Sequence, residues 1–76
     1  ELLVVPASVL PETAFLLRER GGPEAERKLI AAIAARDLAV EALKLDDYGR
    51  THALMIEYPQ IGFVDASVVA LAERLR

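Results

Sequence analysis

The sequence predicts an α/β fold in which helices cover a parallel sheet. Two short apolar runs, residues 1–6 and 38–43, have the length and the Leu- and Val-rich composition of strands. Four other stretches carry apolar residues at helical spacing, and they give the order strand, helix, helix, strand, helix, helix. That alternation is typical of a parallel sheet flanked by helices. Because two strands make a poor sheet, we expect further strands outside these 76 residues.

Local signals set the bounds of the first helices. The first is expected over residues 7–22, where Ser8 is the N-cap and Gly21–Gly22 end the helix. A second is expected over residues 23–36, opening at Pro23. The third is expected to begin at Asp46 or Asp47 and to reach about Tyr58, and the last to begin near Asp65. The apolar faces expected for the last two helices are Thr51, Leu54, Met55 and Tyr58, and Val68, Leu71, Ala72 and Leu75.

The chain has more apolar residues than a domain of its size can bury. Of its 76 residues, 54% are hydrophobic, which is above the usual share for a small globular domain. Its single Met is Met55, inside an expected helix. We therefore expect the segment 1–76 to be the central part of a larger domain, whose other parts or a partner subunit cover the apolar side chains.

Charge and composition argue against several classes of protein. A formal net charge of −3 disfavours a protein that holds nucleic acid mainly by bulk positive charge. The absence of Cys excludes a disulfide framework and a thiolate metal site. No apolar run approaches the roughly 18 residues needed to cross a bilayer, and no signal peptide is recognisable. The default expectation is a cytoplasmic protein without a membrane segment.

Two carboxylates are the best candidates for chemistry. Glu12 comes six residues after the first expected strand, and Asp65 stands where the last helix opens. In open parallel α/β folds, ligands bind beyond the carboxyl ends of the strands. Acids at that rim suit Mg²⁺ or Mn²⁺, which prefer oxygen ligands. The alternative is structural: Asp65 as an N-cap worth about 1 kcal/mol, and Glu12 as an acid favoured by the helix dipole. His52 has no second His or Cys in the chain beside it, which favours a surface residue.

Two stretches in order resemble a known family. "LLVVPASVLPETAFLL" and, later in the chain, "GFVDASVVALAERLR" together resemble the PIN-domain metal-dependent ribonucleases. They look most like the VapC-type toxins of bacterial toxin–antitoxin pairs. Tyr58, before a Pro/Gly loop, also fits that pattern, and the family's acids fall on Glu12 and Asp65. The resemblance covers nearly all of this chain but only the centre of the family's domain, without its N-terminal strand and helix and its C-terminal strands.

The resemblance implies that the parent protein is an endoribonuclease that hydrolyses RNA phosphodiester bonds with Mg²⁺ or Mn²⁺. Asp65 would be a metal ligand, and Glu12 a ligand or an orienter of the metal's water. A homodimer and a neutralising antitoxin protein are implied as partners. Because the family's other acids lie on strands missing here, this chain alone should bind metal weakly and cleave RNA negligibly. The alternative interpretation is a non-catalytic α/β or helical interaction module, in which Asp65 and Glu12 are structural acids.

Overall fold

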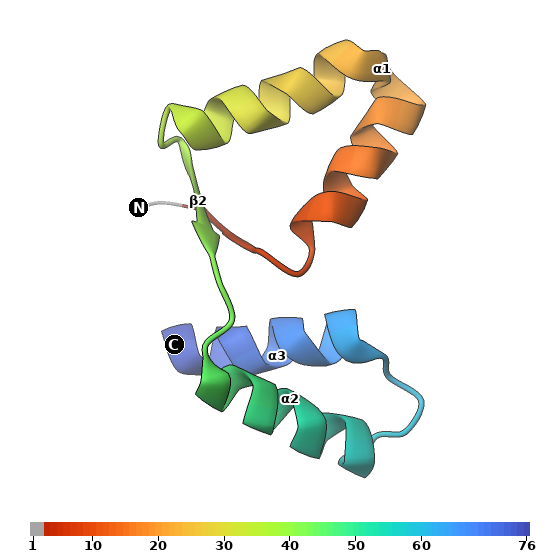
Figure 1. Ribbon diagram of the computed structural model, residues 1–76, viewed down its shortest axis with the longest axis vertical. Coiled ribbons are helices and arrows are strands. Elements are labelled where there is room, and N and C mark those ends of the chain that lie inside the picture. The colour runs from red at the N-terminus through yellow and green to blue at the C-terminus, as the bar shows by residue number, and fades with distance from the viewer. Residues whose placement is uncertain (1–2) are drawn as a thin grey trace. The chain divides into compact units, whose positions relative to one another are not determined.

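The computed structural model describes residues 3–76, which form two strands and three helices (Figure 1). In chain order they are β1 (Leu3–Pro6), α1 (Leu10–Ala34), β2 (Leu38–Glu41), α2 (Leu45–Glu57) and α3 (Phe63–Leu75). The expected α/β class is confirmed, as is the parallel sheet. The first two residues of the first expected strand lie outside the described residues. The chain divides into two compact units, Glu1–Glu41 and Ala42–Arg76.

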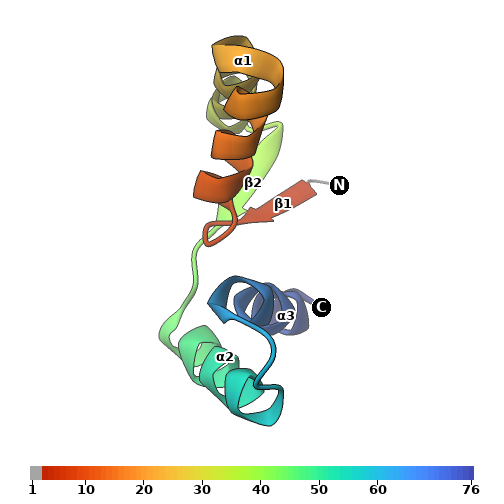
Figure 2. The same ribbon diagram turned by 90° about the vertical axis from the view of Figure 1, so that its right-hand side faces the viewer.

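The first unit contains the sheet. Strands β1 and β2 pair in parallel with Leu3 opposite Leu38 and Pro6 opposite Glu41, and Figure 2 shows the two strands beside each other. Strand β1 is largely exposed, since Leu3 is 72% exposed and Val4 is 44% exposed. A two-stranded sheet shelters little of each strand.

Helix α1 corrects the expected number of helices. The sequence predicts four, with a break at Gly21–Gly22, whereas residues 3–76 contain three because Leu10–Ala34 forms one bent helix (Figure 1). Gly22 leaves the helical region with φ 80° and ψ 176°. An ion pair between Arg18 Nη1 and Glu26 Oε1, 2.8 Å apart, bridges the bend. The regular helix is therefore interrupted at Gly22, where the sequence predicts a break, and the two helical segments on either side make up the one bent element α1.

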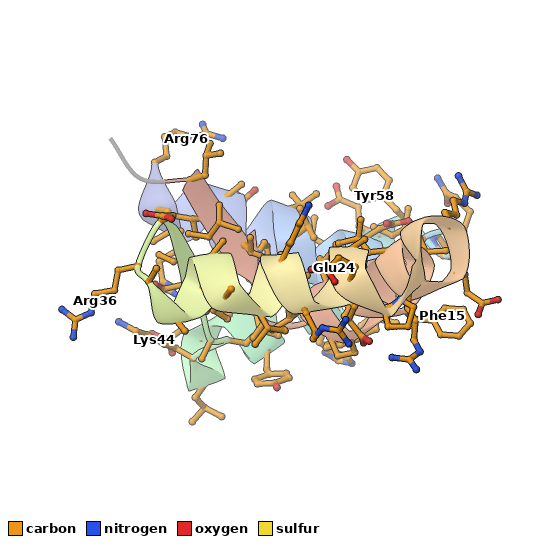
Figure 3. All side chains as sticks on the ribbon, turned by 90° about the horizontal axis from the view of Figure 1, so that it is seen from above. Phe15, Glu24, Arg36, Lys44, Tyr58 and Arg76 are labelled. Carbon is orange, nitrogen blue, oxygen red and sulfur yellow. The ribbon has the colours of Figure 1, made fainter. Side chains whose placement is uncertain are left out.

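The two ends of α1 are set by backbone geometry. Val9, and not Ser8, precedes the first helical residue, and its side chain forms no cap hydrogen bond. At the other end Arg36 has φ 66°, and its N–H donates to the Ile33 carbonyl at 3.0 Å. A left-handed residue in this position is a common way to end a helix, here leading into β2. Along α1, Phe15 is 58% exposed and its ring projects from the ribbon (Figure 3).

The bend predicts that two glycines resist substitution. A Cβ added at Gly21 would lie 2.7 Å from the Ala25 Cβ, and Gly22 has a φ that other residues rarely adopt. We expect Gly21→Ala and Gly22→Ala to lower the free energy of unfolding, the second by about 1–3 kcal/mol. Urea unfolding followed by circular dichroism measures this. The control is Gly49→Ala in α2, where an added Cβ meets nothing within 4 Å and should stabilise by up to about 1 kcal/mol. Stabilisation by all three substitutions would contradict the bend.

The second unit is a hairpin of α2 and α3, which pack side by side (Figures 1 and 2). Its core consists of Leu54, Ala66 and Ala70, with Met55 and Ile61 packed against it. Two buried hydroxyl groups donate hydrogen bonds to backbone carbonyls of their own helices. Thr51 donates to the Asp47 carbonyl at 2.6 Å, and Ser67 donates to the Val64 carbonyl at 2.7 Å.

The packed face of α3 differs from the expected one. Of the expected contact residues only Leu71 is buried, whereas Val68 is 36% exposed and Leu75 is 47% exposed. The other buried positions of α3 are small residues, Ala66, Ser67 and Ala70, and small side chains allow two helices to approach closely. An apolar side of α3 that includes Val68 and Leu75 is consequently left exposed.

Candidate functional site

Glu12 is placed by the start of α1. Helix α1 begins at Leu10, so Glu12 is its third residue, and Pro11 before it is tolerated because the first turn has no partners for its N–H groups. The side chain is exposed. Its carboxylate forms no hydrogen bond or ion pair with the described residues, so it is open to a ligand.

Asp65 is placed by the start of α3, and the expectation that it is the N-cap is wrong. Gly62 occupies the cap position with extended backbone, and Asp65 is the third residue of the helix. The Ala66 N–H donates to the Gly62 carbonyl at 3.1 Å, which closes the first turn through the backbone. Asp65 is exposed, and no hydrogen bond or ion pair holds its carboxylate within residues 3–76. Its negative charge still interacts favourably with the helix dipole.

Each of the two predicted site residues is therefore an exposed acid in the first turn of a helix, but the two residues belong to different compact units. Glu12 belongs to the first unit and Asp65 to the second, so a shared metal site stays a prediction. Among residues 3–76, no three or more His, Cys, Asp or Glu side chains are grouped to hold a metal ion.

Sequence reasoning missed an ion pair inside the hairpin. Arg74 Nε lies 2.9 Å from both carboxylate oxygens of Asp47, whose side chain is only 4% exposed. The Lys44 backbone N–H also donates to Asp47 Oδ2, at 2.8 Å, and the Arg74 guanidinium reaches the Ala42 carbonyl at 3.3 Å. Asp47 thus caps α2 from its third position and ties the end of α3 to the start of α2.

These bonds change the acidity of the carboxyl groups. The hydrogen bond from Arg74, and then that from the Lys44 N–H, hold the pKa of Asp47 below its ordinary value of 3.8. A second pair, between Arg50 and Glu73, has N–O distances of 2.8 and 3.1 Å. It lowers the pKa of Glu73 and raises that of Arg50. Since both pairs are satisfied within the protein, they are structural and do not form the candidate site.

The missed pair had only a weak signal in the sequence. The sequence predicts Asp46 or Asp47 as the N-cap of this helix, whereas Lys44 holds the cap position and Asp47 is the third helical residue. The partner, Arg74, is 27 residues away from Asp47. No periodic pattern links positions on two different helices.

Comparisons with known proteins identify no relative. No family model matches the chain, and neither a curated protein nor a solved structure matches it. Over the part of the chain that the structure describes, no helix combines the length and the apolar character needed to cross a membrane.

Proposed function

We propose that this chain is the central part of a PIN-type endoribonuclease, similar to VapC toxins, with Asp65 and Glu12 as carboxylate ligands for Mg²⁺ or Mn²⁺. The observation that supports the proposal best is the state of Asp65. A purely structural acid at a helix start normally accepts a backbone N–H, as Asp47 does. Asp65 accepts no such bond from the described residues and keeps its carboxylate exposed.

The chemistry of the two side chains fits a hard divalent cation. Mg²⁺ is typically held by one or two carboxylates and keeps several waters. When bound, such an ion makes water a better nucleophile and stabilises the charge that develops on a phosphodiester. Glu12 and Asp65 contribute negative charge from the first turns of two helices, where the backbone fixes their positions. Further acids are expected on the parts of the domain that precede and follow these residues.

The same proposal includes the binding partners of the chain. RNA is the substrate, and an antitoxin protein or a second copy of the chain would cover apolar surface. Large exposed side chains are present for such contacts, among them Leu45 at 87% and Ile56 at 66% exposed on α2, and Leu75 on α3. Exposed large apolar side chains of this kind can contribute to an interaction site.

Calorimetric titration with Mn²⁺ tests the metal site. We expect weak binding to the chain that disappears in both Asp65→Asn and Glu12→Gln, because a single site needs both carboxylates. Asp46→Asn is the matched control: Asp46 is also an exposed acid in a first helical turn, and its loss should leave the titration unchanged. The same titration on a chain extended at both ends should show tighter binding. Absence of metal binding in the extended chain would exclude the nuclease.

The second candidate function is a non-catalytic interaction module, which the exposed apolar side of α3 favours. In that case Asp65 and Glu12 are independent structural acids. Their substitutions should then have small and additive effects on stability, and no metal should bind to either length of chain. The titration and a double-mutant cycle on these two residues therefore separate the two functions.

A further inference from the structure

Two aromatic rings meet on the surface of the α2–α3 hairpin. The chain has two Tyr, two Phe and no Trp, and one of each kind forms this pair. Tyr48 lies near the start of α2 and Phe63 is the first residue of α3. Their ring centroids are 6.3 Å apart and their planes are 11° from parallel. Tyr48 is 50% exposed and Phe63 is 42% exposed.

The core does not account for this pair. Its members lie outside the buried cluster of Leu54, Ala66 and Ala70. Aromatic pairs in proteins have centroids about 4.5–7 Å apart, so these rings stand near the wide end of that range. The Tyr48 hydroxyl forms no hydrogen bond within residues 3–76. Two nearly parallel, half-exposed rings offer a flat apolar surface on which another planar ring can stack.

The surroundings of the pair favour a nucleobase as that ring. Lys44 lies one turn before Tyr48 and His52 one turn after it, and both are exposed. Residues four apart lie along the same side of a helix, so the His52 imidazole lies on the side of α2 that carries Tyr48, and Lys44 adds a cation at the N-cap of that helix. Proteins that bind single strands combine positive charge for the phosphates with aromatic rings for the bases. Asp65 follows Phe63 by two positions, in the same first turn of α3.

We propose that Tyr48 and Phe63 form a stacking platform for a base of single-stranded RNA. The inference rests on the proposed function, because it places the base beside the nucleotide whose phosphate would face a metal ion on Asp65. Bases in a duplex are already stacked and paired, so the platform selects unpaired RNA. Every base has a stacking face, so we expect little dependence on sequence.

RNA binding without metal tests the platform. A fluorescein-labelled single-stranded RNA oligomer is titrated with the 76-residue chain at low salt in the presence of EDTA, and anisotropy is recorded. Tyr48→Leu and Phe63→Leu keep apolar bulk and remove a planar ring. Each should weaken binding by about 5-fold to 150-fold, the range that loss of one stacking ring gives. Tyr48→Phe keeps the ring and should bind like the unchanged chain. Tyr58→Leu, at a tyrosine that is 45% exposed and outside the pair, is the matched control.

The outcomes separate this proposal from the nuclease itself. An oligomer of abasic nucleotides should bind the unchanged chain and Phe63→Leu equally weakly, because it carries phosphates but no bases. The platform is wrong if the unchanged chain binds no RNA, or if both Leu variants bind RNA as Tyr58→Leu does. Because EDTA removes divalent ions, that result leaves the Mn²⁺ titration on Asp65 unaffected. Conversely, stacking without metal binding to either the 76-residue chain or the extended chain would leave an RNA-binding module and exclude the nuclease. Circular dichroism melts confirm that each variant folds.

Discussion

Replacing Leu54 by Ala is expected to destabilise the α2–α3 hairpin more than any other single truncation discussed for this chain. Leu54 is 4% exposed and packs against Ala66 and Ala70. Removing a buried Leu side chain costs about 2–5 kcal/mol, because transfer energy is lost and a cavity remains. Whole domains are stable by only about 5–15 kcal/mol, and small units bury a smaller share of their surface. We therefore expect a large loss of helical signal in Leu54→Ala near room temperature.

The control for Leu54 lies on the same helix. Leu45 is 87% exposed at the start of α2, so Leu45→Ala removes the same atoms without opening a cavity. Its effect should stay within about 0.5 kcal/mol. Thermal unfolding followed by circular dichroism at 222 nm compares the two variants. Equal effects would mean that α2 and α3 do not pack through Leu54 in solution.

The sheet and the helical character of the chain could be predicted because they depend on local patterns. The apolar runs ending at Pro6 and beginning at Leu38 do become parallel strands. The interruption at Gly21–Gly22 could also be predicted, because Gly-Gly-Pro disfavours a continuous helix, and Gly22 does leave the helical region. The sequence does not show that the two segments form one bent element, with the Arg18–Glu26 ion pair across the bend and Gly21 close to Ala25.

The packed face of α3 was mispredicted for a related reason. Most of this helix is apolar, so periodicity alone gives two overlapping stripes. The larger side chains, Val68 and Leu75, carry the stronger hydrophobic signal, yet the hairpin packs through Ala66 and Ala70. The small side chains of α3 let α2 come close enough to bury Leu54. The candidate acids were identified in their first helical turns, but a capping role for Asp65 depends on backbone geometry that the sequence does not encode visibly.

Replacing Asp47 by Asn should also destabilise the hairpin strongly. The substitution keeps the size of the side chain but removes its charge, so the partly buried Arg74 guanidinium loses its ion pair with Asp47. Asp46→Asn, one position earlier at an exposed acid in the same turn, is the matched control and should change stability little. Urea unfolding measures both variants. Similar midpoints for the two would show that the bonds from Arg74 to Asp47 contribute nothing to stability.

The pH dependence of the hairpin's stability is a sharper test of the ion pair between Asp47 and Arg74. Because its pKa in the folded chain is lower than its ordinary value of 3.8, Asp47 binds protons less readily when folded than when unfolded. Its stabilisation is therefore complete above the ordinary pKa and is lost as the pH falls through the lower, folded-state pKa. Glu73 acts in the same direction through Arg50. Melting temperatures measured between about pH 2 and pH 7 should fall less steeply on acidification in Asp47→Asn than in the unchanged chain. Glu73→Gln removes only the exposed ion pair with Arg50, so it should change the slope of melting temperature against pH less than Asp47→Asn does. A larger change in Glu73→Gln would mean that the acid sensitivity of the hairpin comes mainly from Glu73.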